Sequence, residues 1–230
     1  MMVQHIQIRD VEIPPLGLPG RLAIPPGAGS IVIFAHGSGS SRFSPRNNAV
    51  ARALNETGMA TLLFDLLAPE EEADRRNVFD IPLLAGRLID AVRWTEAEQD
   101  IVDRPLGLFG ASTGAAAALV AAAELGPRVG AIVSRGGRPD LADAALEEVR
   151  APTLLIVGGN DEGVIELNEA ALKRLTGPKS LKLIPGATHL FSEPGALQAV
   201  TAEAIRWFGL HLGHASRETD EVPHALHKSR

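Results

Sequence analysis

A serine between two glycines, in the segment Gly110-Ala-Ser-Thr-Gly114, carries the clearest chemical signal in the sequence. An apolar run precedes it and an alanine-rich stretch follows it, which is the strand, sharp turn and helix that a GxSxG nucleophile requires. The glycines leave room where neighbouring backbone must approach the strained turn closely. An alternative is that Ser112 only caps the first turn of a helix, which predicts no partners for it elsewhere. The context favours Ser112 as a nucleophile.

A serine hydroxyl needs a base that takes its proton and a carboxylate that orients the base. Downstream, Asp161 follows the apolar run in TLLIVGGND, and His189 follows the next such run in SLKLIPGATH. Asp140, in SRGGRPD, is a competing acid after a strand, and Glu162 is a lesser one. The sequence favours a triad of Ser112, His189 and Asp161, with Asp140 left open as the acid.

Two backbone N–H groups are candidates for stabilising an oxyanion beside Ser112. Thr113 follows the serine at the start of the helix, where N–H groups are free and the helix dipole is positive. Ser38 lies in HGSGSSR, a glycine-serine loop after an earlier strand, where the second donor of such a site is expected. A simple flexible turn is the other interpretation of that loop, and it lacks the spacing of a phosphate-binding motif.

Alternating apolar runs and helical patterns must place these residues at one sheet edge. Strands are predicted at residues 3–8, 21–24, 31–35, 60–64, 106–109, 131–134, 153–157 and 180–184. Helices are predicted at residues 47–56, 81–98, 113–125, 164–175 and 194–212. This alternation predicts an α/β fold, with a mostly parallel central sheet of about 7–8 strands and helices on both faces.

One domain is expected over residues 1–212, followed by a polar, aperiodic tail at 213–230 that is predicted to be disordered. The first two strands are separated only by short proline-rich turns, so we expect them to pair antiparallel at one edge. Residues 66–80 are the one long connection and are expected to form a solvated loop or a short helix. No segment is long enough for a cap domain.

Composition excludes several classes of function. The net charge is −6 with acids and bases interspersed, which disfavours nucleic acid and anionic membranes as partners. Cysteine is absent, so the chain has neither a disulfide nor a cysteine nucleophile. The N-terminal residues lack a signal-peptide pattern, and we expect a soluble, cytoplasmic protein. The loop at residues 158–163 lacks the ligands of a calcium site, so neither metal nor cofactor is expected.

Together these motifs resemble the α/β-hydrolase superfamily over residues 3–212, in the order nucleophile, acid, histidine. The compact, uncapped chain is most similar to the dienelactone hydrolase-like group. HGSGSSRFSPRN, LLFDLLAPEEEADRRNVFDI and SRGGRPDL are also similar to hydrolase domains joined to phosphoribosyltransferases. The resemblance implies the α/β-hydrolase fold, the triad and oxyanion donors named above, and a phosphoribosyltransferase partner. Dienelactone hydrolases proper use cysteine, so the serine here indicates a serine esterase instead.

The sequence therefore predicts a serine hydrolase that cleaves carboxylic esters of small or accessible substrates through an acyl-enzyme. Thioesterase, lactonase, amidase and perhydrolase activities use the same machinery and stay open, as does a non-catalytic interaction module. Predicted substrate-pocket residues are Arg135, Leu190 and Phe191, with Leu66, Leu67, Arg42 and Arg46 as further candidates. Arg135 could attract a substrate carboxylate or form a structural ion pair.

Overall fold

The computed structural model describes residues 5–213 and has one eight-stranded sheet. Its strands are β1 Gln7–Ile13, β2 Leu18–Ile24, β3 Ser30–Ala35, β4 Met59–Phe64, β5 Leu106–Ala111, β6 Val129–Arg135, β7 Thr153–Gly158 and β8 Lys179–Ile184. The strand order is β1-β2-β4-β3-β5-β6-β7-β8. β1 pairs antiparallel with β2, and β2 with β4, while all later pairs are parallel. The predicted fold class is confirmed.

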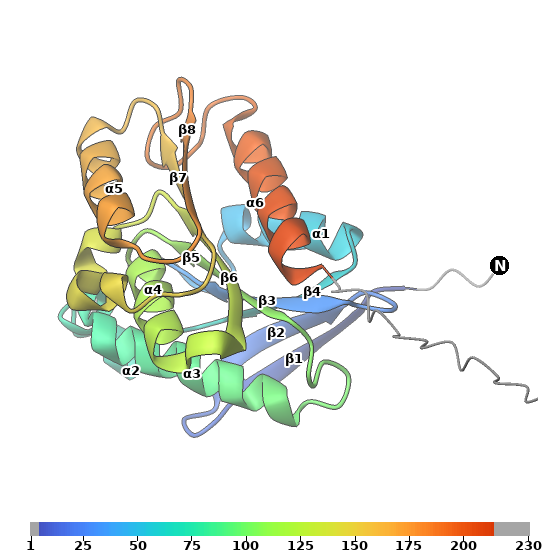
Figure 1. Ribbon diagram of the computed structural model, residues 1–230. Coiled ribbons are helices and arrows are strands. Elements are labelled where there is room, and N and C mark those ends of the chain that lie inside the picture. The colour runs from blue at the N-terminus through green and yellow to red at the C-terminus, as the bar shows by residue number, and fades with distance from the viewer. Residues whose placement is uncertain (1–4, 214–230) are drawn as a thin grey trace, which may run out of the picture.

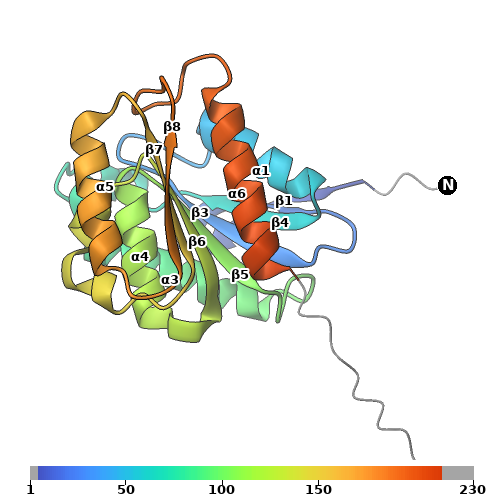
Figure 2. The ribbon, with the colours of Figure 1, turned by 45° about the horizontal axis from the view of Figure 1, so that its top comes forward.

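Helices cover both faces of the sheet (Figures 1 and 2). The α-helices are α1 Pro45–Glu56, α2 Pro69–Glu72, α3 Ile81–Ala97, α4 Thr113–Leu125, α5 Glu162–Arg174 and α6 Ala196–Leu212. Short 3₁₀ segments lie at η1 Asn77–Phe79, η2 Gly126–Arg128 and η3 Pro139–Glu147. α1 and α6 lie on one face, and α3, α4 and α5 lie on the other. The long connection after β4 therefore contains the short α2 and η1 rather than a cap.

The central strands are apolar on both faces because helices bury both. In β3, Ile31 and Ile33 pack against the α3 and α4 side, while Val32 and Phe34 pack against α1 and α6. This alternation follows from the two-residue period of a strand. A strand buried on both sides holds the loop at its end in a fixed position, which is what a catalytic site requires.

The order in which the parallel strands follow one another across the sheet reverses at β3. β3 pairs with β4 on one side and with β5 on the other, so the connections after β3 and β5 lead away from each other. Such a switch point opens a crevice at the carboxyl ends of the strands, where ligands bind in open α/β sheets. The loops containing Ser38 and Ser112 begin at this crevice.

Two predicted elements differ from the structure. The first strand is β1 at Gln7–Ile13 rather than residues 3–8, because an edge strand tolerates the charged residues that seemed to end it. The helical segment η3 was not predicted at all; it is irregular, with positive φ at Asp143. The predicted tail lies outside the described residues beyond residue 213. In the described range, no helix is long and apolar enough to cross a membrane.

Candidate active site

Ser112 sits at the sharp turn between β5 and α4 in a backbone conformation that is rare for a residue with a side chain. Its φ is 52° and its ψ is −122°, which costs on the order of 1–3 kcal/mol. Surrounding backbone holds this geometry: Ser112 N–H donates to the Arg135 carbonyl at 3.3 Å, and Arg138 N–H donates to the Ser112 carbonyl at 3.1 Å. The turn is therefore fixed from both sides and presents the Ser112 side chain at the strand end.

The glycines around Ser112 are required by close backbone approach. A Cβ on Gly110 would lie 2.4 Å from Ala115 Cα, and one on Gly114 would lie 2.2 Å from the Ala35 carbonyl oxygen. A Cβ on Gly37 would lie 2.9 Å from Ser112 Cβ. Helix α4 can therefore begin directly against β3, and the loop after β3 can lie directly against the serine.

His189 and Asp161 are brought together from two different loops. Asp161 immediately precedes α5 after β7, and His189 lies between β8 and α6. His189 Nδ1 is 2.7 Å from Asp161 Oδ2, a distance typical of a charge-assisted hydrogen bond. The side chain of His189 is 38% exposed and that of Asp161 is 18% exposed, so the histidine reaches solvent while its partner is sheltered.

The competing acids lie elsewhere. Asp140 accepts two hydrogen bonds from the Arg138 guanidinium, at 2.9 and 2.8 Å. Glu162 is exposed at the start of α5. Of the three acids that the sequence leaves open, Asp161 is thus the one that contacts His189.

Ser112 and His189 line a common cavity of about 250 Å³, here called the serine cavity. It is lined by Gly37, Ser38, Ser40, Ser44, Arg46, Asn47, Ala111, Ser112, Arg135, Gly136, His189 and Leu190. No hydrogen bond joins Ser112 Oγ to His189 in the described part of the chain. In ligand-free sites this contact is often long and tightens only when substrate binds.

The two expected oxyanion donors lie side by side. Ser38 N–H donates to Thr113 Oγ1 at 3.0 Å, so this N–H has a partner in the ligand-free structure. Thr113 is the first residue of α4, where a backbone N–H has no acceptor within the helix. The Thr113 hydroxyl therefore lies beside both amides, next to the serine.

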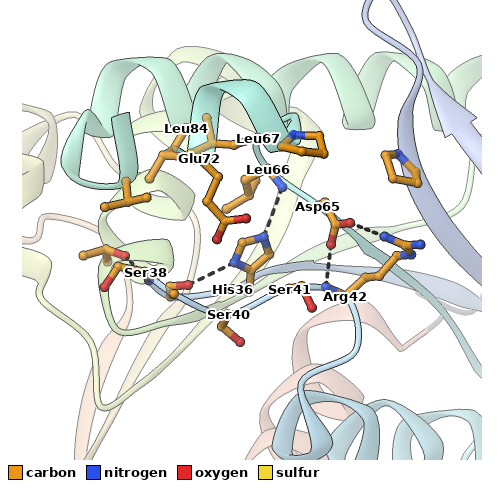
Figure 3. Close-up of a pocket in the computed structure, with 16 residues that line it drawn as sticks. His36, Ser38, Ser40, Ser41, Arg42, Asp65, Leu66, Leu67, Glu72 and Leu84 are labelled. Atoms are coloured by element: carbon orange, nitrogen blue, oxygen red, sulfur yellow. Dashed lines mark hydrogen bonds and ion pairs between the residues drawn. The ribbon is translucent and has the colours of Figure 1, made fainter. Parts of the chain in front are cut away.

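His36, which the sequence did not single out, fixes the loop that carries Ser38 (Figure 3). Its Nδ1 contacts the Gly37 carbonyl at 3.0 Å, and its Nε2 accepts from Leu66 N–H at 3.1 Å. An acceptor at Nε2 requires the neutral imidazole with its proton on Nδ1. Burial lowers the pKa of His36 below its usual value, despite opposing contributions from the Gly37 carbonyl, Asp65 and Glu72. The signal in the sequence was a histidine at a strand end before glycine.

This lowered pKa predicts a loss of stability in acid. Above about pH 6.5, His36 is neutral in both the folded and the unfolded chain and contributes no pH dependence. As the pH falls through that value, the unfolded chain binds the proton first, so the folded state becomes relatively less stable. We expect the melting temperature to fall between pH 7.5 and pH 5.5 by more in the wild type than in His36→Gln. Equal falls would show that His36 does not contribute.

The Gly37–Ser40 loop also lines a second cavity of about 280 Å³, here called the apolar cavity (Figure 3). Leu66, Leu67, Val78 and Leu84 form its apolar wall, and Ser38 and Thr113 border it. Two of these residues, Leu66 and Leu67, were predicted as specificity residues. The serine cavity and the apolar cavity share Gly37, Ser38 and Ser40, so Ser38 borders both cavities, whereas Thr113 lines only the apolar cavity.

The remaining predicted pocket residues fall into two groups. Arg135, Arg46 and Leu190 line the serine cavity. Arg42 lines the apolar cavity and is paired there with Asp65, whose Oδ1 accepts from Arg42 N–H at 2.7 Å.

Phe191, which was predicted to line the substrate pocket, lines neither the serine cavity nor the apolar cavity. It has a positive φ of 53° and is only 2% exposed, because its ring packs in the core between the sheet and α1 and α6. Within residues 5–213, no cluster of His, Asp and Glu side chains is placed to hold a metal ion.

Comparison with known proteins identifies the family of the chain. A family profile described as alpha/beta hydrolase domain matches residues 28–207. The chain belongs to the α/β-hydrolase family. A dienelactone hydrolase from Anabaena variabilis ATCC 29413 is 53% identical, with a TM-score of 0.85 over 91% of this chain and 99% of that one. The fold is also that of Est1E from Butyrivibrio proteoclasticus, with a TM-score of 0.72 at 20% identity over 88% and 97% of the two chains.

A longer relative comes from Mycobacterium tuberculosis strain H37Rv, and its name designates it provisionally as a phosphoribosyl transferase. It is 56% identical over 209 residues, which is 89% of this chain and 47% of that protein. The α/β-hydrolase chain thus spans about half the length of this curated relative.

Proposed function

We propose that this α/β hydrolase is a serine esterase that cleaves carboxylic esters through an acyl-enzyme. One observation carries the proposal: the strained Ser112 shares a cavity with His189, whose Nδ1 is 2.7 Å from Asp161. This is the order of groups that activates a serine hydroxyl, with the base oriented by an acid. Because His189 reaches solvent, the site suits small or accessible esters.

In the proposed reaction, Ser112 Oγ attacks the ester carbonyl carbon while His189 Nε2 takes the hydroxyl proton. The N–H groups of Ser38 and Thr113 stabilise the negative oxygen that forms on the tetrahedral intermediate. Collapse of the intermediate releases the alcohol, which receives the proton from His189, and leaves an acyl group on Ser112. His189 then takes a proton from water, which attacks the acyl-enzyme and restores free Ser112 with release of the acid.

For the Thr113 hydroxyl, the proposal implies a change of partner during the reaction. Ser38 N–H, which donates to Thr113 Oγ1 at 3.0 Å, would donate to the oxyanion instead or to both oxygens. The hydroxyl can itself rotate and donate to the oxyanion, because a threonine O–H is both donor and acceptor.

A fluorophosphonate probe tests the proposal directly, because it reacts with activated serines. The expected result is covalent labelling of the wild type at Ser112, located by peptide mass spectrometry, together with hydrolysis of short p-nitrophenyl esters. Ser112→Ala serves as the control and should not be labelled. A wild-type protein that is neither labelled nor active on a panel of esters, thioesters and amides would refute the proposal.

The partner implied by the sequence resemblance, a phosphoribosyltransferase, stays a prediction. The relative's name is consistent with it, but that name belongs to a protein about twice the length matched here.

A further inference from the structure

The serine cavity has two arginines and no acidic residue in its lining. Arg135 reaches it from the end of β6, and Arg46 reaches it from the first turn of α1. Ser44, the N-cap of the 12-residue helix α1, lines the same cavity, so the positive end of the helix dipole also faces it. The polar groups beside Ser112 thus create a positive potential in the cavity.

Arg135 is the most unusual of these groups because it is buried without a counter-charge. Arg135 is only 8% exposed, and its Nη1 is buried with no hydrogen-bond partner among the described residues. Arg46 Nε is likewise buried and unpartnered. The nearest aromatic contact is the Phe109 ring, whose centroid is 6.0 Å from Arg135 Cζ, and this weak cation–π contact does not replace an acceptor.

Two other half-buried arginines have carboxylate partners. Arg42 pairs with Asp65, and Arg87 pairs with Glu71 at 2.7 Å. In the described range, no ion pair forms at Arg135 or Arg46. Buried charges in proteins are normally paired, because an unpaired one carries a large desolvation cost. The structure thus removes the alternative of a structural ion pair that the sequence left open for Arg135.

Arg135 is nevertheless charged at neutral pH. Burial, together with repulsion from Arg46, lowers its pKa to about 10, which still leaves the guanidinium protonated at pH 7. Two like charges that repel each other beside a reactive serine are stabilised when an anion enters between them. Guanidinium groups bind the oxygens of carboxylates and phosphates with paired hydrogen bonds.

We propose that Arg135 and Arg46 form an anion subsite that binds a carboxylate or phosphate group of the ester substrate while Ser112 attacks the ester carbonyl. The inference rests on the proposed function. The apolar cavity adjoins the serine cavity at the shared residues Gly37, Ser38 and Ser40, so it would accept an apolar part of the same molecule. The preferred substrates are therefore esters with an anionic group near the scissile bond, and matched neutral esters are hydrolysed less efficiently.

Matched ester pairs test the subsite and identify the anion. Monomethyl succinate with dimethyl succinate places a carboxylate on the acyl part, and 2-acetoxyethyl phosphate with 2-acetoxyethanol places a phosphate on the alcohol part. In the wild type we expect kcat/KM to favour the anionic member of at least one pair by about tenfold or more, as charged hydrogen bonds predict. The pair that shows the preference reveals which anion and which side of the ester the subsite serves.

The variants Arg135→Gln and Arg46→Gln should bring that ratio close to one. Arg52→Gln is the matched control. Arg52 lies exposed on the same helix as Arg46, and its substitution changes the net charge by the same amount. Arg135→Met, which keeps the length of the side chain without its charge, repeats the test if Arg135→Gln folds poorly by circular dichroism. Preferences near one in both wild-type pairs, or a preference that survives in the Arg135 variants, would overturn the subsite.

Binding without turnover separates this inference from the proposed function. Calorimetric titration of Ser112→Ala with monomethyl succinate, and separately with inorganic phosphate, should show millimolar binding that Arg135→Gln removes. Neutral esters hydrolysed without an anionic preference would contradict the subsite but leave the esterase intact. A wild type that is inactive on every ester would contradict the esterase proposal. The titration alone would then test the subsite, and the absence of any heat of binding with both anions would overturn it.

Discussion

Asp161→Asn is expected to lower kcat/KM for p-nitrophenyl acetate about 10⁴-fold while leaving the protein folded. The carboxylate lies 2.7 Å from His189 Nδ1 and holds the proton on that nitrogen, which leaves Nε2 free to take a proton from Ser112. Asparagine keeps the size of the side chain but can present an N–H donor to Nδ1. The imidazole proton would then lie on Nε2, the wrong nitrogen for a base.

Asp140→Asn is the matched control, because it is the same change at the acid that the sequence could not exclude. Its carboxylate contacts Arg138 rather than His189, so its rate should stay within a fewfold of the wild type. Circular dichroism and melting temperatures confirm that both variants fold. A greater loss of rate in Asp140→Asn than in Asp161→Asn would refute the assignment of the acid.

The sequence could predict where the chemistry lies because strand ends of a parallel sheet meet at one edge. That rule placed the loops of Ser112, Asp161 and His189 together without any coordinates. It favoured Asp161 but could not exclude Asp140, since both follow strands at the same edge. The choice depends on loop conformation and on Arg138, two residues from Asp140, which binds that carboxylate and holds it away from His189.

Side-chain direction in loops was the main feature that sequence could not supply. Leu190 and Phe191 are adjacent and both apolar, yet one borders the serine cavity and the other is buried in the core. Phe191 has a positive φ, and it is not a glycine, which would have indicated such a conformation in the sequence. The missing partner of Arg135 was hidden for the same reason, because pairing depends on which side chains surround it in space.

A second large effect is expected at a residue that performs no chemistry. Gly114→Ala should lower the free energy of unfolding by about 3 kcal/mol or more, at the upper end of the cost of overpacking. The new Cβ would lie 2.2 Å from the Ala35 carbonyl oxygen and 2.5 Å from that of His36. Both atoms are backbone at the end of the central strand β3, so no side-chain rotation relieves the clash. A fall in melting temperature of about 6 °C or more would follow for a domain of this size.

Gly86→Ala is the matched control, because Gly86 is also a helical glycine but has nothing within 4 Å of the position of a new Cβ. There alanine should raise stability by about 0.5–1 kcal/mol, as expected for an exposed helix interior. Gly114→Ala should also lose ester hydrolysis at temperatures where it is folded, because relief of the clash moves the strand end that leads into Ser38 away from Ser112. The opposite result would be a variant that melts like the wild type and keeps full activity. It would show that helix α4 does not need its close approach to β3. It would also show that the glycines of GxSxG are not required to hold Ser112 against the Ser38 loop.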